Sequence, residues 1–233
     1  MLWRDSLIMF DRSTKSLWSQ VLGAAVAGPQ EGRELTEIPA EQTTWEDWKQ
    51  RHPDTLVLVK PKNIRGTNYA DYHRNPRSVG VLGTKNPDSR MRPKSLVFGM
   101  EEGGDAAAIP FGLLEHEPVL NVTALGKPLV VFSPPGEQTA LVFERTVDGE
   151  ELFFEQVEGD SGRLTVKDTQ SGSTWSWEDG SCLQGPFEGT SLTRVPGTAV
   201  YWGIWAQFHP ETALVRQGEQ PPAKQAKNSE NPR

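Results

Sequence analysis

The sequence predicts a mainly β (β-rich α+β) fold built from two related units with short helices, the first of them incomplete. Residues 11–55 align with residues 168–212 at a constant offset of 157 without a gap, and 18 of the 45 aligned positions are identical. Much of the remaining chain consists of short apolar runs separated by turn residues, the pattern of β-strands. Because a long-period repeat reflects a repeated structural unit, the duplication sets the predicted architecture.

Each copy of the repeat predicts the same series of elements. A strand comes first, then an aspartate-led turn, a second hairpin arm that contains a tryptophan, and a turn in which proline presets φ and glycine supplies positive φ. A further strand ends at a proline. In the first and second copies these elements are the strands at 7–10 and 164–167, the arms at Trp18 and Trp175, the turns at 28–32 and 185–189, and the strands at 35–38 and 192–195.

One helix follows in each copy. Thr43-Thr44 precedes Trp45 and Asp47 as at a capped helix N-terminus. Trp45, Trp48 and His52 are spaced i, i+3 and i+7, which places them on one helical face. Proline disfavours helix at the residue before it, so His52-Pro53 ends the helix, and a strand is predicted at 55–59. The second copy repeats this plan with Trp202, Trp205 and His209.

The rest of the chain divides by composition. We expect an incomplete first unit at 1–59, a basic irregular connection at 60–95, a complete second unit at 96–216 and a disordered tail at 217–233. Strands are predicted at Leu96–Met100, Ala106–Pro110, Pro128–Phe132, Ala140–Arg145 and Glu151–Gln156, with a hairpin turn at 147–150.

The offset also predicts what the first unit lacks. The counterpart of nearly all of residues 96–160 would lie before Met1, so the chain is expected to start roughly 60 residues into the first copy. Missing strands leave sheet edges unpaired, and such edges pair readily with another chain. We therefore predict a protein partner or a homo-oligomer formed through an exposed strand edge near residues 7–11.

Composition excludes some classes of function. The net charge of −7 argues against nucleic-acid binding, which needs a basic surface. No apolar run approaches the length of a membrane-spanning helix, and Met1–Phe10 is too short and too charged for a secretory signal. Cys182 is the sole cysteine, which rules out an intrachain disulfide and a cysteine-based zinc site.

Several motifs together resemble the prokaryotic family known as domain of unknown function 3179. They are Leu7–Arg12, Ser16–Gln20, Gly28-Pro29, Thr43-Thr44-Trp45, His52–Thr55, Asp88-Ser89-Arg90 with Pro93-Lys94, and His116-Glu117 with Asn121. The resemblance covers most of residues 2–215 and implies an extracytoplasmic protein of no established activity, although no signal peptide is present in this chain. Family members typically carry a Cys-x-x-Cys motif ahead of the part that matches Leu2. Its internal equivalent, Val131–Gly136, has no cysteine, so we predict no cofactor and no metal site.

The candidate functional residues fall in two groups. His116 and Glu117 could supply acid–base chemistry or one metal ligand each, and Asn121 could orient a ligand; the alternative is a hydrogen-bonded turn that fixes the strands. In the basic connection, Arg90, Tyr72 and His73 could bind an anion or an acidic partner, whereas a solvated loop is the alternative. The paired tryptophans and the histidines that end the two helices are interpreted as scaffold.

The sequence therefore favours a non-enzymatic binding or structural module, such as an accessory subunit of a larger assembly. The alternative is a metal-dependent or acid–base enzyme, resembling a hydrolase, centred on His116 and Glu117. The two hypotheses differ in geometry, because an enzyme needs these side chains to converge with another titratable residue in an open pocket.

Overall fold

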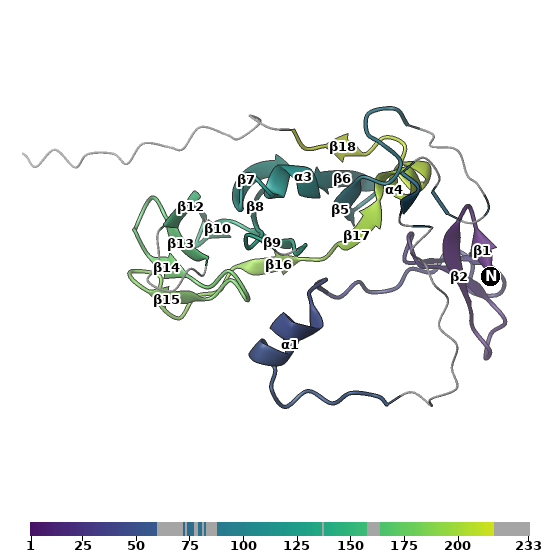
Figure 1. Cartoon of the computed structure of the whole chain (residues 1–233), viewed down its shortest axis with the longest axis horizontal. Helices are drawn as coiled ribbons and strands as arrows, with labels where there is room; N and C mark the ends of the chain where they lie inside the picture. The colour runs from purple at the N-terminus through teal and green to yellow at the C-terminus, as the bar shows by residue number, and fades with distance from the viewer. Residues whose placement is uncertain are drawn as a thin grey trace, which may run out of the picture. The chain divides into compact units, whose positions relative to one another are not determined.

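The computed structural model describes residues 1–59, 72, 74–76, 79–80, 82, 88–136, 138–157 and 164–216. The chain is mainly β, with several small sheets and a few short helices, as the sequence predicts (Figure 1). It divides into two compact units. Unit 1 comprises Met1–Ile38, Gln42–Val97 and Ala199–Thr212, and unit 2 comprises Pro39–Glu41, Phe98–Thr198 and Ala213–Arg233.

The N-terminal strands of unit 1 form a four-stranded antiparallel sheet. Its strands are β1 (Leu2–Trp3), β2 (Ser6–Phe10), β3 (Leu17–Ser19) and β4 (Ala24–Ala27), in the order β1-β2-β3-β4. Met9 pairs with Trp18 across β2 and β3. The predicted strand at 7–10 and the predicted arm at Trp18 are therefore confirmed, whereas β1 was not predicted.

The turn after β2 is closed by an aspartate in the same way as the equivalent turn of the second copy. The equivalent residues Thr14 and Ser171 donate their hydroxyls to Asp11 Oδ2 at 2.5 Å and to Asp168 Oδ2 at 2.8 Å. Each aspartate also accepts a backbone N–H on Oδ1, from Ser13 at 2.8 Å in the first copy and from Ser171 at 2.6 Å in the second. A carboxylate that accepts a backbone N–H two or three residues on mimics a backbone turn. The duplicated sequence thus produces an aspartate-closed turn in both places, with an equivalent hydroxyl bond and a backbone bond that differs by one residue.

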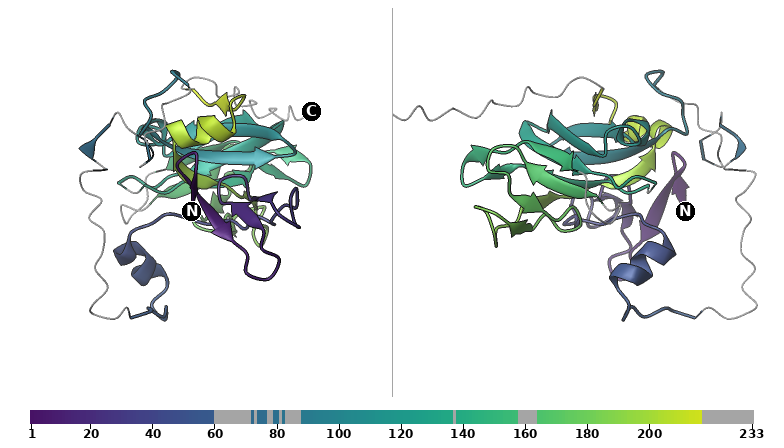
Figure 2. Two further views of the ribbon diagram at one scale, coloured as in Figure 1. Left: turned by 90° about the vertical axis from the view of Figure 1, so that its right-hand side faces the viewer. Right: turned by 60° about the vertical axis from the view of Figure 1, so that its left-hand side comes forward.

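Helix α1 (Trp45–Arg51) forms where the sequence predicts it. Thr44 caps it by accepting the backbone N–H of Asp47 on Oγ1 at 3.1 Å, and His52 ends it. This helix buries none of its residues, and the segments on either side of it, 35–44 and 52–59, contain no strand. Figure 2 shows these flanking segments from two further directions.

Two predicted strands of the first copy are wrong. In the described chain neither residues 35–38 nor residues 55–59 form a strand, and the nearest pairing is a single bridge between Ala24 and Glu34 just before the first of them. Their second-copy equivalents are strands because partner strands lie beside them: β16 (Thr193–Val195) pairs with β9 (Leu141–Glu144), and β18 (Ala213–Leu214) pairs with β6 (Asp105–Pro110). An apolar, strand-like sequence becomes a strand only where its backbone groups find partners.

Unit 2 contains two four-stranded antiparallel sheets and a two-stranded hairpin. One sheet has the order β16-β9-β8-β7, with β8 at Lys127–Phe132 and β7 at Val119–Ala124. The other has the order β12-β13-β14-β15, with strands at Phe154–Val157, Thr165–Asp168, Thr174–Trp175 and Cys182–Gln184. The hairpin pairs β10 (Thr146–Val147) with β11 (Glu150–Glu151), as predicted. Its central residues, Asp148 and Gly149, both have positive φ, which suits a tight two-residue turn.

A further four-stranded sheet has the order β17-β5-β6-β18, with β17 at Thr198–Tyr201 and β5 at Leu96–Glu102. Its β18 strand runs parallel to β6, with Ala213 opposite Ala107. Helix α4 (Trp202–Phe208) follows β17 directly and ends at His209, which confirms the predicted helix. Unlike α1, it buries most of its side chains, namely Trp202, Gly203, Ile204, Trp205 and Ala206.

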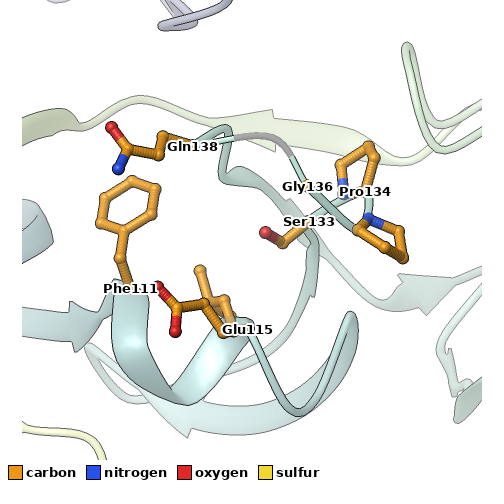
Figure 3. Close-up of a pocket in the computed structure, with 8 residues that line it drawn as sticks. Phe111, Glu115, Ser133, Pro134, Gly136 and Gln138 are labelled. Atoms are coloured by element: carbon orange, nitrogen blue, oxygen red, sulfur yellow. The ribbon is translucent and has the colours of Figure 1, made fainter.

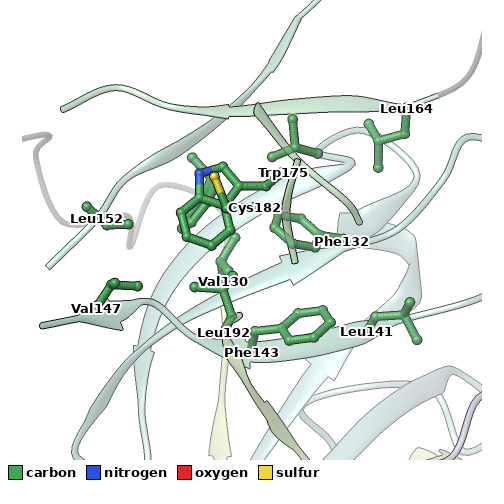
Figure 4. Packing of buried hydrophobic residues seen from close by; sticks show 12 residues of the cluster. Val130, Phe132, Leu141, Phe143, Val147, Leu152, Leu164, Trp175, Cys182 and Leu192 are labelled. Atoms are coloured by element: carbon green, nitrogen blue, oxygen red, sulfur yellow. The ribbon is translucent and has the colours of Figure 1, made fainter. Parts of the chain in front are cut away.

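The core of unit 2 is built from both halves of the second copy (Figure 4). Trp175 and Phe154 meet edge to face, with ring centroids 5.6 Å apart. Side chains of the strand-rich half, Val130, Phe132, Leu141, Phe143, Val147, Leu152 and Phe154, pack with side chains of the later half, Leu164, Val166, Trp175, Cys182 and Leu192. The later half begins with strand β13, whose equivalent in the first copy is β2.

The glycine of the Gly-Pro turn is required by the backbone in both copies. Gly185 has a φ of +116°, and a Cβ there would lie 2.8 Å from Ser173 Cα. Gly28, its equivalent, has a φ of +95°, and a Cβ there would lie 2.9 Å from Ser16 Cα. Only glycine meets both the backbone and the steric requirement, so the Gly-Pro turn is present in both copies.

Other predictions for the second unit need small corrections. Strand β12 starts at Phe154, because Glu151 belongs to the hairpin strand β11 instead. Strand β7 and the short helix α3 (Phe111–Leu114) were not predicted. Most of the basic connection and the whole tail at 217–233 lie outside the described residues.

Candidate functional site

His116 and Glu117 lie in the turn that follows α3. Both donate their backbone N–H to the carbonyl of Leu113, at 3.1 Å and 3.0 Å. His116 is exposed and Glu117 is half-buried. The backbone of both residues thus builds the hydrogen-bonded turn that was the alternative to a chemical role.

A pocket of about 270 Å³ lies close to this turn (Figure 3). The hydroxyl of the buried Ser133 points into it, and Glu115 and Gln138 border it. The remaining wall residues are Phe111, Leu114, Pro134, Pro135 and Gly136. Among the described residues that line the pocket, Glu115 is the titratable one. Neither His116 nor Glu117 lines it. The pocket therefore does not bring the predicted acid–base pair together.

Asn121 is a structural bridge. Its Nδ2 donates to the carbonyl of Phe154 at 2.7 Å, and its Oδ1 accepts the N–H of Phe154 at 2.9 Å. Both groups lie in the interior, where an unpaired polar group is costly, so the pair of bonds fixes β7 against β12. The side chain that the sequence suggested for ligand orientation is occupied by the backbone of β12.

Arg90 acts as a clamp on the chain that follows α4. Its Nη1 donates to the carbonyl of Thr212 at 2.8 Å, and its Nη2 donates to the carbonyl of Pro210 at 3.3 Å. The guanidinium also lies over the ring of Trp202, 5.0 Å from the ring centroid. Asp88 holds it from the other side at 2.6 Å, and that hydrogen bond raises the pKa of Arg90.

Tyr72 also makes contacts within the chain. Its hydroxyl accepts the backbone N–H of Gly80 at 3.1 Å, and Lys94 Nζ lies 3.6 Å from its ring centroid, close enough for a cation–π contact. Burial lowers the pKa of Lys94. His73, the third residue predicted from the basic connection, lies outside the described residues. The structure therefore does not bring Arg90, Tyr72 and His73 together as one described site.

The most informative comparison is between the two helices of the repeat. The Trp48 indole donates to Thr55 Oγ1 at 3.1 Å, and the Trp205 indole donates to Thr212 Oγ1 at 3.0 Å. The rings of Trp48 and His52 lie 4.1 Å apart, and those of Trp205 and His209 lie 4.0 Å apart. The local structure of this helix and its C-terminal turn is therefore the same in both copies.

Burial separates the two copies. Trp45 is 53% exposed, whereas its equivalent Trp202 is fully buried, and Leu58 is 88% exposed, whereas its equivalent Val215 is buried. The same contrast holds at six positions of the first copy, which we call the exposed core set: Leu7, Met9, Leu35, Ile38, Trp45 and Leu58. Their second-copy equivalents, Leu164, Val166, Leu192, Val195, Trp202 and Val215, are all buried.

The exposed core set is the candidate functional site. A single exposed apolar residue is ordinary on a protein surface. These six differ because each of their equivalents in the second copy is buried. The sequence contained the signal, since the offset alone identifies each pair. What the sequence did not show is that the first-copy positions stay uncovered within the described chain.

Comparison with known proteins gives a family and little else. A family model described as a protein of unknown function (DUF3179) matches residues 1–212. The chain belongs to this family. No curated protein and no solved structure matches the chain. Membership of DUF3179 therefore confirms the resemblance seen in the motifs, and it carries no assigned activity.

In the parts of the chain that the structure describes, no three His, Cys, Asp or Glu side chains gather closely enough to hold a metal ion. None of the described helices has the length and apolar character needed to cross a membrane.

Proposed function

We propose that this DUF3179 protein is a non-enzymatic protein-binding module whose first copy docks onto another polypeptide. The observation that carries the proposal is the exposed core set, in which six side chains are exposed although their second-copy equivalents are buried. The partner takes in the first copy the place that residues 88–154 hold in the second, where they contact Trp202, Val215 and the core of unit 2. Such a module serves as a subunit or accessory part of a larger assembly.

The free energy of burying these six side chains favours association with a partner. Burying a large aliphatic or aromatic side chain contributes about 1.5–3 kcal/mol. Six such side chains therefore represent a substantial gain, which offsets the entropic cost of association and of ordering the docked segment.

Helix α1 supports the same proposal. It has seven residues and buries none of them. Isolated helices shorter than about 12 residues are marginal in water, because nucleation is costly and tertiary packing supplies most helical stability. Its side-chain cap and the Trp48–Thr55 bond hold it in the shape of α4, which leaves it ready to pack against a partner.

The enzyme hypothesis has no comparable support. His116 and Glu117 do not line the pocket beside them, and Asn121 is committed to Phe154. We therefore do not carry acid–base or metal-dependent catalysis forward as a second candidate.

Photo-crosslinking at Trp45 tests the proposed function. Trp45→p-benzoylphenylalanine places a reactive ketone on the exposed core set, and Leu183→p-benzoylphenylalanine is the control, because Leu183 is similarly exposed at 58% but its strand β15 lies in the second copy. Each variant is expressed at its natural level in the cells of its source and irradiated. We expect a polypeptide adduct of defined mass at position 45 and little or none at position 183. No adduct at 45, or equal adducts at both positions, would contradict the proposal.

A further inference from the structure

We infer that the partner segment docked by residues 45–58 has the chemistry of this chain's own residues 88–110, namely an Asp-x-Arg turn followed by two β-strands. This inference rests on the proposed function and deepens it by naming the occupant. The second copy is the template, because there residues 88–110 contact the equivalents of 45–58 through an arginine clamp, two helix-capping carbonyls and a strand ladder.

The first copy contains the equivalents of the groups that Arg90 contacts in the second copy. In the second copy Arg90 binds the carbonyls of Pro210 and Thr212 and lies over Trp202. The equivalents of these three residues are Pro53, Thr55 and Trp45, and the chain from His52 to Thr55 turns in the same way as that from His209 to Thr212. In both, the threonine N–H donates to the histidine carbonyl at 3.1 Å.

The first copy also has a carboxylate at the position of Glu211, which lies near Arg90 in the second copy. The carboxylate of Glu211 favours the charged form of Arg90, in addition to the stronger effect of Asp88. Asp54 stands at the position equivalent to Glu211, and it is exposed. An arginine that approaches the first copy therefore meets a carboxylate beside the two carbonyls, which suits a guanidinium better than a neutral or acidic group.

The start of α4 shows the second kind of contact. Its first backbone N–H groups have no intrahelical partner, and those of Trp202 and Gly203 donate to the carbonyls of Ser95 and Pro93 at 2.8 Å and 2.9 Å. These carbonyls come from the same segment as Arg90.

The strand ladder supplies the third contact. Ala213 and Leu214 pair in parallel with Ala107 and Ala108, and the N–H of Val215 donates to the carbonyl of Ala108 at 3.0 Å. Leu56, Val57 and Leu58 are their equivalents; all three are exposed and lie outside any helix or strand. A segment with exposed apolar side chains and no strand partner among the described residues accepts an added strand through main-chain hydrogen bonds, while the side chains select the partner.

A synthetic peptide of residues 88–110 is the probe, and the full chain is the receptor. Leu58→Pro removes the N–H that is equivalent to the Val215 donor. Val57→Pro is the matched control, because successive N–H groups alternate in direction along a strand and that of Val57 points away from the added strand. Both residues are exposed, so neither change disturbs the core of the chain.

We expect the labelled peptide to bind the full chain in a fluorescence-anisotropy titration and to slow amide hydrogen exchange across residues 45–58. Leu58→Pro in the chain should weaken binding by about tenfold or more, since it costs a main-chain hydrogen bond and introduces a steric clash. Val57→Pro should change binding by less than about threefold. Arg90→Ala in the peptide should weaken binding by about tenfold or more, because it removes two charged hydrogen bonds and a ring contact.

Three outcomes would overturn the inference: absence of peptide binding, equal effects of the two proline variants, or protection confined to residues 202–215, which would indicate exchange with the chain's own segment. Each can be told apart from failure of the proposed function. If Trp45 forms its adduct while the peptide does not bind, the chain docks a partner of different chemistry. If neither the adduct nor peptide binding is seen, both proposals fail.

Discussion

The indole nitrogen of Trp205 donates a 3.0 Å hydrogen bond to Thr212 Oγ1, and this bond ties the end of α4 to the residue that precedes β18. Both residues are almost fully buried. Trp48 and Thr55 make the equivalent bond at 3.1 Å at the end of α1, where the surroundings are partly open to solvent. The two bonds have the same geometry and differ in environment, which makes them a matched pair for experiment.

Removing the threonine hydroxyl should therefore cost different amounts in the two copies. Thr212→Val leaves a buried indole N–H without its partner, and we expect a loss of about 1–3 kcal/mol in the free energy of unfolding. Thr55→Val should cost no more than about 0.5 kcal/mol, because water can replace the hydroxyl at a partly open site. Urea unfolding followed by circular dichroism measures both. Equal losses would show that Thr55 is as well covered as Thr212.

Asn121 gives a second prediction, on the core of unit 2. Asn121→Ala leaves both the N–H and the carbonyl of Phe154 unpaired in the interior, so the free energy of unfolding should fall by roughly 2 kcal/mol or more. Thr123→Ala is the control on the same strand, at an exposed position, and should cost less than about 1 kcal/mol. If Asn121 served mainly to orient a ligand, its replacement would leave the stability of the protein unchanged.

His209 makes the stability of the protein depend on pH. Burial lowers its pKa below the ordinary value of about 6.5, so the folded chain binds this proton less readily than the unfolded chain. The associated stability is fully present above pH 6.5 and is lost as the pH falls towards the lowered pKa. We expect the unfolding free energy to decrease from pH 7 to pH 5.

A histidine variant isolates that contribution. His209→Gln should flatten the decrease in unfolding free energy between pH 7 and pH 5. A pH dependence that survives His209→Gln unchanged would assign it to other groups.

The local elements could be predicted from sequence because their causes are local. Thr44 and His52 bracket α1 as the capping pattern indicates, and Asp148-Gly149 forms the predicted hairpin turn. The mainly β character follows from the alternating apolar runs. Helix α3 escaped prediction because four residues are too few to show a helical period.

The errors arose where structure depends on distant partners. Residues 55–59 have a strand-like sequence, yet a strand needs a neighbour, and β6 pairs with the second copy's β18 instead. The candidate site was hidden for the same reason. Nothing in the identity of Trp45 distinguishes it from Trp202; burial does.

Amide hydrogen exchange on the dilute, purified chain tests the central claim most directly. The backbone N–H groups of His52 and His209 make equivalent bonds, to Trp48 at 2.8 Å and to Trp205 at 2.9 Å, so local geometry predicts the same exchange for both. The account predicts that α4 and His209 exchange slowly, through opening of a packed core, while α1 and His52 exchange quickly. Equal, strong protection of both helices in the monomeric chain would contradict the claim that the first copy presents an uncovered core.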